Sequence, residues 1–234
     1  MLLYLVRHGR TDFNDQQLFT GRLDIPLNAA GRTQSQRLAE HLRLVPFTEA
    51  WSSDLVRASE TARTTLSHRP RLASKLRTTP LLTDRQLGSL QGKSFLDITE
   101  YPDDPEIESA ESLEKRLHEW LSTLVTAHTP LSSPATTPTY PVADPFEPHR
   151  HTPGRGIILA VTHEECLLTL LKLLTSSSSA VDTVVPASLD IDARCGNTGV
   201  AILRVWWVEE EGKMEARGRL EAWAMDEHLL ADEE

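Results

Sequence analysis

Short hydrophobic runs alternate along the chain with segments in which hydrophobic residues recur at helical spacing. Residues 2–6 and 157–161 are apolar runs without a helical period, as expected of strands buried on both faces of a sheet. Four helices are predicted between and after these strands: residues 28–45, a helix from a cap at Ser52 or Ser53 to Leu66, residues 112–128, and a helix after residue 161 through Leu174. The order of elements therefore indicates strands that alternate with helices.

Weaker patterns complete this outline. Residues 50–51 and 80–82 are short strand candidates, and residues 200–208 and 215–224 are predicted to form a hairpin. Strands alternating with helices predict the α/β class, as a three-layer α/β/α sandwich with a mostly parallel central sheet. Ligands of such sheets bind at the carboxyl ends of the strands. We therefore expect the chemistry of this protein just after residues 6 and 161.

One segment differs in character from the rest. Residues 129–156 hold seven of the 14 prolines and show no periodicity. This composition predicts a mobile surface insertion within a single domain that spans residues 1–234.

Composition narrows the class of protein. The net charge of −10 at pH 7 argues against nucleic-acid binding, which favours a basic face. No apolar run approaches the length of a membrane span, and no secretory signal is visible. Cys166 and Cys195 lie far apart and match neither a zinc motif nor a redox motif, so buried thiols in a reducing compartment are expected. We expect a cytoplasmic protein without nucleic-acid or membrane partners, and its oligomeric state stays open.

Both predicted strand ends carry a histidine. Arg7-His8-Gly9 follows the first strand, and Thr162-His163 follows the second. A neutral imidazole can attack phosphorus, an adjacent arginine holds phosphate with a rigid fork of donors, and glycine permits a sharp turn beside the ligand. The strand ends therefore predict a phosphoryl-transfer site.

The sequence here resembles a known family. Arg7-His8-Gly9-Arg10-Thr11, with Asn14, resembles the RHGxTxxN signature of the histidine phosphatase (phosphoglycerate mutase-like) superfamily. Further blocks similar to that family follow in order, within residues 20–34, 52–62, 84–92, 108–109, 161–163 and 197–200. A lone RHG would be weak evidence, whereas an ordered set of blocks is specific.

The resemblance implies a role for each matching residue. His8 would be the nucleophile, and Asp84 would be the general acid and then the base that activates water. Arg7, Arg57 and His163 would surround the transferring phosphoryl group. The phosphate cradle would be completed by Asn14, Thr20 and Gly21. The resemblance implies neither a metal nor a cofactor, because arginines and imidazoles supply the positive field.

Three positions stay open. Asp84 stands where many members have Glu, so its carboxyl group reaches one methylene less. Glu164 stands where members commonly have glycine; its backbone N–H could still bind substrate, but its carboxylate must point away from the substrate or reject some substrates. For Arg22 the sequence favours neither of two interpretations, a contact with substrate or an ordinary surface charge.

The leading hypothesis is a phosphatase that hydrolyses small phosphorylated metabolites, with sugar phosphates or bisphosphates as the expected substrates. A cofactor-dependent mutase is the alternative within enzymes, and Arg10, where mutases usually carry Glu, favours the phosphatase. A non-catalytic module that binds a phosphorylated ligand is a third hypothesis, which Asp84 and Glu164 keep open. A protein phosphatase is a further alternative, because an open pocket could admit a phosphotyrosine side chain.

Overall fold

The computed structural model describes residues 1–100, 102–130, 156–176 and 179–230. The strands of this part of the chain are β1 (Leu2–Arg7), β2 (Glu49–Ser53), β3 (Arg77–Thr79), β4 (Ile157–Thr162), β5 (Asp182–Val184), β6 (Val200–Glu210) and β7 (Lys213–Met225). The α-helices are α1 (Asp12–Asp15), α2 (Ala29–His41), α3 (Val56–Thr65), α4 (Pro70–Ala73), α5 (Ala110–Ala127) and α6 (Glu164–Leu174). Short 3-10 helices are η1 (Pro80–Leu82), η2 (Gly88–Leu90) and η4 (Glu227–Leu229).

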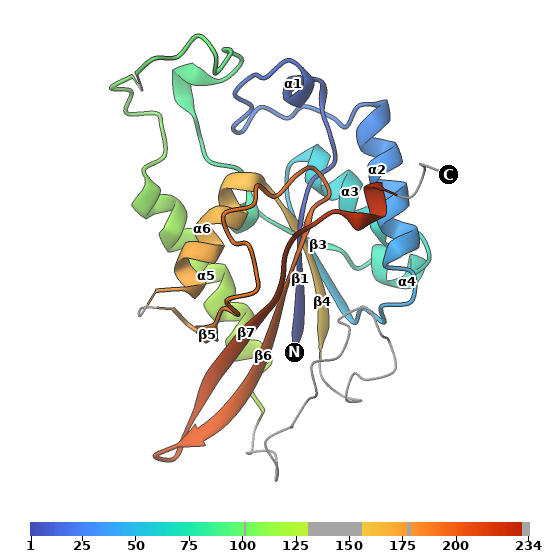
Figure 1. Ribbon diagram of the computed structural model, residues 1–234, viewed down its shortest axis with the longest axis vertical. Coiled ribbons are helices and arrows are strands. Elements are labelled where there is room, and N and C mark those ends of the chain that lie inside the picture. The colour runs from blue at the N-terminus through green and yellow to red at the C-terminus, as the bar shows by residue number, and fades with distance from the viewer. Residues whose placement is uncertain (101, 131–155, 177–178, 231–234) are drawn as a thin grey trace.

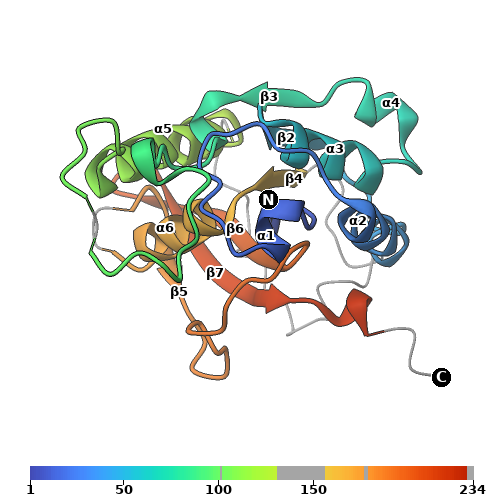
Figure 2. The same ribbon diagram turned by 90° about the horizontal axis from the view of Figure 1, so that it is seen from above.

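The seven strands form one sheet in the order β3-β2-β4-β1-β6-β7-β5. Four of the six neighbouring pairs are parallel, and β6 is antiparallel to both β1 and β7. Helices cover both faces: α5 and α6 lie on one side, and α2, α3 and α4 lie on the other (Figures 1 and 2). The predicted α/β sandwich with a mostly parallel sheet is confirmed.

Alternation along the central strands explains the two helical layers. Side chains of a strand point to opposite faces in turn. Leu3 and Leu5 of β1 therefore join the core under α5 and α6, whereas Leu2, Tyr4 and Val6 join the core under α2 and α3. Strand β4 divides its residues in the same way. Because both faces are covered, the two central strands are buried throughout.

Most predicted elements are confirmed, and two are wrong in detail. Residues 80–82 form η1 and not a strand, because Pro80 starts a turn in which the Thr79 hydroxyl accepts a hydrogen bond from the Leu81 N–H. Ser52 and Ser53 lie in β2 and do not cap a helix; α3 begins after Leu55. The strand near residue 80 lies just before the turn, as β3.

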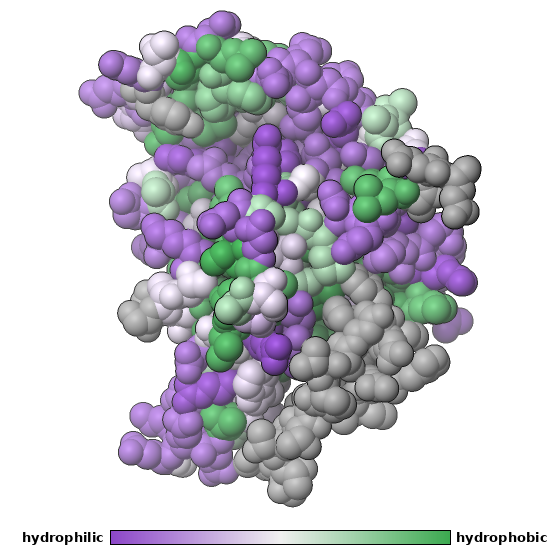
Figure 3. Space-filling model, viewed as in Figure 1, coloured by the Kyte–Doolittle hydropathy of each residue, from purple (hydrophilic) through white to green (hydrophobic). Residues whose placement is uncertain are grey.

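Several other expectations meet the structure only in part. Residues 131–155 of the predicted insertion lie outside the described residues, and the single-domain organisation stays a prediction. Cys166 and Cys195 are both buried and free. In the described ranges, no helix has the length and apolar character needed to cross a membrane. The face drawn in Figure 3 is mostly hydrophilic, with a hydrophobic patch over the segment that follows η2.

Candidate active site

A cavity of about 750 Å³ opens at the carboxyl ends of β1 and β4. Arg7 pairs with Thr162 across these strands, so His8 and His163 leave the sheet side by side. Their ring centroids lie 5.2 Å apart. The predicted residues that line the cavity are Arg7, His8, Asn14, Thr20, Gly21, Asp84 and Glu164. The structure therefore brings most of the predicted site to the expected edge of the sheet.

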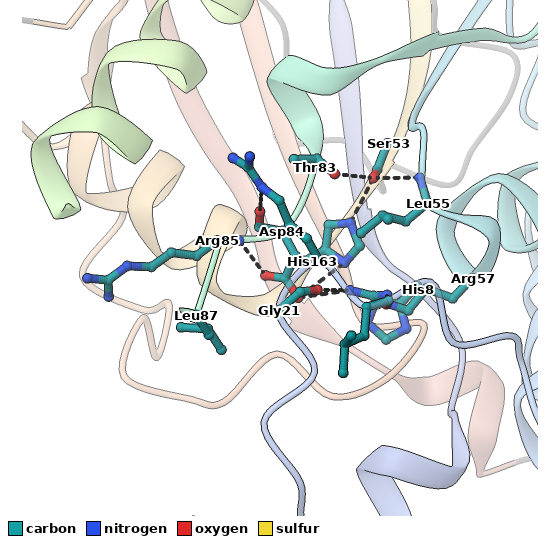
Figure 4. Close-up of polar contacts among 12 residues, drawn as sticks. His8, Gly21, Ser53, Leu55, Arg57, Thr83, Asp84, Arg85, Leu87 and His163 are labelled. Atoms are coloured by element: carbon teal, nitrogen blue, oxygen red, sulfur yellow. Dashed lines mark hydrogen bonds and ion pairs between the residues drawn. The ribbon is translucent and has the colours of Figure 1, made fainter. Parts of the chain in front are cut away.

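Four of the predicted side chains form what we call the floor: His8, Arg57, Asp84 and His163. Figure 4 shows them pointing toward one another; His8 and His163 follow β1 and β4, Arg57 lies in α3, and Asp84 lies in the segment after η1. Arg57 and His163 do not line the cavity itself but lie directly beneath it, with 0% and 1% of their surface exposed.

His8 has its tautomer set by its own neighbour. Its Nδ1 lies 2.7 Å from the Gly9 carbonyl oxygen. A carbonyl oxygen can only accept, so Nδ1 carries the proton and the neutral ring keeps a lone pair on Nε2. Burial, followed by the positive charges of Arg57 and Arg7, holds the pKa of His8 well below its usual range. His8 is thus a neutral imidazole whose Nε2 is the unprotonated nitrogen.

The turn after His8 is held against two helices. The Gly9 N–H donates to the Thr61 hydroxyl of α3 at 3.0 Å. A Cβ added to Gly9 would lie only 2.6 Å from the Gly31 carbonyl oxygen of α2. Glycine at position 9 is therefore required by close packing, which fixes the backbone beside the His8 ring.

His163 is the N-cap residue of α6 and is equally constrained. Its Nε2 lies 2.9 Å from the Ser53 hydroxyl, and that hydroxyl accepts a hydrogen bond from the Leu55 N–H (Figure 4). Its buried Nδ1 has no hydrogen-bond partner among the described residues. Burial, then Arg57 and His8, lower the pKa of His163 well below the usual value. A second neutral imidazole thus lies beside His8 with one ring nitrogen unpaired.

Arg57 is the cation at the centre of the floor. Its Nη1 donates to the Leu23 carbonyl, and its Nη2 donates to the Gly21 carbonyl, each at 2.8 Å. Nη2 also pairs with the Asp84 Oδ2 at 3.0 Å. Gly21 meets Arg57 with a φ of +52°, a conformation that favours glycine. These contacts hold a buried guanidinium group in one orientation.

Asp84 is the carboxyl group of the floor. Burial raises its pKa above the ordinary value, and the Arg57 guanidinium opposes that rise. Its Oδ2 also lies 3.6 Å from the His163 Nδ1, while its Oδ1 accepts a hydrogen bond from the Arg85 N–H. Asp84 therefore faces the cavity as a carboxyl group that takes up a proton more readily than an exposed aspartate.

Glu164 does not point away from the cavity. Its Oε2 lies 3.0 Å from the Arg7 Nη1, and its carboxylate also accepts hydrogen bonds from Arg194 at 2.5 and 3.1 Å. Arg7 is further held by donating to the Cys195 carbonyl oxygen at 2.9 Å. The two arginines therefore share one carboxylate on the cavity wall.

Of the remaining predicted residues, some line the cavity and one does not. Asn14 and Thr20 line the cavity, and the Asn14 Oδ1 accepts hydrogen bonds from the Thr11 N–H and the Asn197 Nδ2, which leaves its amide group to donate. Arg22 is not brought to the cavity. It donates to the Asp84 carbonyl and pairs with Glu108 at 3.2 Å, so its contacts are with the protein.

Sequence reasoning missed several residues around the cavity. Arg194 lies in a segment without periodicity, and nothing in its surroundings marks it. Ser53 is a candidate helix cap by sequence, but in the structure it lies in β2 and its hydroxyl contacts His163. The cavity mouth carries partly exposed side chains that we call the rim: Phe95, Glu164, Leu168 and Arg194. In the described part of the chain, no cluster of three or more histidine, cysteine or acidic side chains could hold a metal ion.

Comparison with known proteins identifies the family of this chain. The model of the histidine phosphatase superfamily (branch 1) matches residues 3–131, more than half of the chain. The chain is 41% identical over 96 residues to the phosphoglycerate mutase-like protein 4 of Arabidopsis thaliana. That match covers 38% of this chain, and the chain spans only 39% of the length of that relative.

Two solved structures share the fold over almost their whole length. A mycobacterial glucosyl-3-phosphoglycerate phosphatase in complex with VO3 has a TM-score of 0.65 at 23% identity, over 95% of this chain and 98% of its own. A phosphoserine phosphatase of Entamoeba histolytica has a TM-score of 0.65 at 19% identity, over 97% and 98%. At these identities the likeness is one of fold.

Proposed function

The chain belongs to the histidine phosphatase superfamily, and from that membership and the floor geometry we propose that it is a metal-independent phosphatase of small phosphomonoesters. The phosphoryl group passes first to the Nε2 of His8 and then to water. Sugar phosphates are the substrate class that we expect. One observation carries the proposal: the contact between the His8 Nδ1 and the Gly9 carbonyl leaves the lone pair on Nε2, in a ring that Arg57 and Arg7 keep neutral.

In the first step, the Nε2 lone pair of His8 forms a bond to phosphorus while the bond from phosphorus to the alcohol oxygen breaks. Asp84 gives its proton to that oxygen, so a neutral alcohol leaves. Its raised pKa supports this role, and a phosphate dianion nearby raises the pKa further. Arg7 and Arg57 supply positive charge to the equatorial oxygens of the phosphoryl group.

In the second step, Asp84 is a carboxylate and accepts a proton from water. The water oxygen bonds to phosphorus, the P–N bond breaks, and its electron pair returns to Nε2. Inorganic phosphate then leaves, and Asp84 is protonated for the next cycle. His163 and the Asn14 amide can donate to phosphoryl oxygens in both steps.

A mutase is the second candidate, and the name of the Arabidopsis relative favours it. In a mutase the phosphohistidine returns its group to the substrate instead of to water. In this chain Arg10 lines the cavity and pairs with Asp15 at 3.3 Å. The position at which mutases usually carry Glu thus holds a positive charge beside the cavity, which supports the phosphatase.

The test compares two products with one enzyme preparation. Release of inorganic phosphate from sugar phosphates is measured beside interconversion of 3- and 2-phosphoglycerate, both with and without excess EDTA. We expect phosphate release that EDTA leaves unchanged, and an acid-labile phosphoenzyme on rapid quenching. Interconversion faster than release would replace the phosphatase with a mutase. Binding of phosphate without either reaction would indicate a non-catalytic module.

A further inference from the structure

Every arginine that lines the cavity has a carboxylate partner within the protein. Arg10 pairs with Asp15, whereas Arg7 and Arg194 share Glu164. Arg57, beneath the cavity, pairs with Asp84. In the proposed mechanism the substrate phosphoryl group draws on Arg7 and Arg57. Among the described residues that line the cavity, no arginine lacks a carboxylate partner and is free to bind a second anionic group.

Arg194 is the residue for which this pairing matters most. Arg194 lines the cavity, and its side chain is 74% exposed. A guanidinium fork in that place would bind a second anionic group of a substrate in a bidentate manner. Glu164 occupies the fork through Nε and Nη2, at 2.5 and 3.1 Å. The carboxylate therefore fills the place that a substrate anion would take.

Part of the cavity lining is apolar and suits an uncharged group. Leu18, Leu87, Phe95 and Leu168 contribute to this part. Phe95 is fixed by edge-to-face packing on Phe19, with the ring centroids 5.5 Å apart. A carboxylate or second phosphate placed there would lose hydration without gaining a charged partner. The pairing of Glu164 with Arg194 and the apolar lining residues therefore both disfavour a second negative charge.

We propose that Glu164 is a specificity-determining residue that selects phosphomonoesters of uncharged alcohols and disfavours substrates with a second anionic group. This inference rests on the proposed phosphatase function and narrows its substrate class, against bisphosphates and phosphorylated carboxylic acids. Specificity of this kind is a difference between two affinities, and Glu164 acts by removing a contact from the disfavoured substrate.

Glycerol 3-phosphate and 3-phosphoglycerate provide a matched pair of substrates. Both are esters of a primary alcohol, and they differ by a carboxylate in place of a hydroxymethyl group. We expect kcat/KM to favour glycerol 3-phosphate by about tenfold or more in the natural chain. Glu164→Ala frees Arg194, and it should shift the ratio toward 3-phosphoglycerate by about tenfold. The effect of freeing Arg7 acts on the shared phosphoryl group and cancels in the ratio.

Two further variants isolate the cause. Arg194→Ala added to Glu164→Ala should restore the original ratio, because the freed fork is then gone. Glu60→Ala removes a carboxylate that pairs with Arg32 and does not line the cavity, and should leave the ratio unchanged. Glu164→Gln keeps the size of the side chain and should shift the ratio in the same direction. It replaces Glu164→Ala in the test if that variant does not fold.

The outcomes separate this inference from the function on which it rests. Phosphate release at equal kcat/KM from both esters by the natural chain would overturn the inference alone. The same holds for a ratio that neither Glu164 variant changes, or a shift that persists without Arg194. Absence of phosphate release from every ester would overturn the proposed function itself, and the inference with it.

Discussion

The floor and the rim of the cavity are built by different means. Three of the four floor side chains, His8, Arg57 and His163, are almost fully buried, and Asp84 is 16% exposed. Backbone carbonyls hold two of them, as the His8 contact with Gly9 and the Arg57 contacts with Gly21 and Leu23 show. Rim side chains are partly exposed and are held by other side chains, as in the pair of Glu164 with Arg194. The floor thus depends on the sheet and the helices next to it, whereas the rim, where we propose that substrates are selected, depends on individual side-chain pairs.

Removing the nucleophile should give the largest effect. We expect His8→Ala to abolish phosphate release, by at least a thousandfold, and to abolish the acid-labile phosphoenzyme, because no other ring nitrogen has the same position. His68→Ala is the matched control, because His68 is a surface residue paired with Glu40. Turnover at the ordinary rate in His8→Ala would end the assignment of the floor as the catalytic centre.

Asp84→Asn should divide substrates by their leaving groups. We expect a loss of about a hundredfold to ten-thousandfold for alkyl phosphates, which need a proton on the departing oxygen, and less than tenfold for p-nitrophenyl phosphate. Asp97→Asn, outside the cavity, is the control. Equal losses for both substrates would remove Asp84 from the acid role.

The same two floor residues set the pH dependence of turnover. His8 must be unprotonated, and its lowered pKa places the acidic limb of kcat/KM below pH 6.5. Asp84 must be protonated, and its raised pKa places the alkaline limb above the ordinary aspartate range. The alkaline limb should disappear in Asp84→Asn when p-nitrophenyl phosphate is the substrate. Persistence of that limb would assign it to another group.

The pH dependence of folding stability should reflect His228, which contacts the segment that carries Arg194 and Asn197 toward the cavity. Buried His228 contacts the Thr198 hydroxyl at 2.9 Å, and burial, then His41 and Arg37, lower its pKa from 6.5 to about 4. The unfolded chain therefore binds the proton more readily, so this contribution to stability is complete above pH 6.5 and is lost as the pH falls toward 4. Between pH 7 and pH 5 the loss is roughly 1–2 kcal/mol.

Urea unfolding at both pH values checks this effect. The free energy of unfolding of His228→Gln should fall less between pH 7 and pH 5 than that of the natural chain, by the same 1–2 kcal/mol. His8 and His163 contribute in the same direction in both proteins, so the difference isolates His228. Identical pH dependence would show that His228 is not buried as a neutral ring.

The smallest effect is expected on the apolar part of the rim. Phe95→Ala should raise KM about threefold to tenfold for esters of apolar alcohols and change kcat less than twofold, because it removes contact area and no reacting group. Leu96→Ala is the matched control: this neighbour is 74% exposed and does not line the cavity. A fall in kcat alone would mean that Phe95 positions the floor.

The same contrast explains how much of the molecule the sequence predicts. His8 and His163 follow short apolar runs whose lack of a helical period indicates buried strands, so their proximity at one sheet edge follows from topology. The pairing of Arg7, Glu164 and Arg194 does not, because it joins three distant segments and Arg194 lies in a segment without periodicity. At residues 80–82 an apolar run read as a strand became a 3-10 helix because Pro80 favours a turn.

The pair of Arg57 with Asp84 couples the binding of an anion to the uptake of a proton from the solvent. An oxyanion that takes over the Arg57 Nη2 deprives Asp84 of the partner that holds its pKa down, so the carboxyl group takes up a proton. Sulfate, which does not titrate near neutrality, would therefore bind with net proton uptake. In calorimetry, its apparent enthalpy of binding would depend on the ionisation enthalpy of the buffer, and in Asp84→Asn that dependence would vanish.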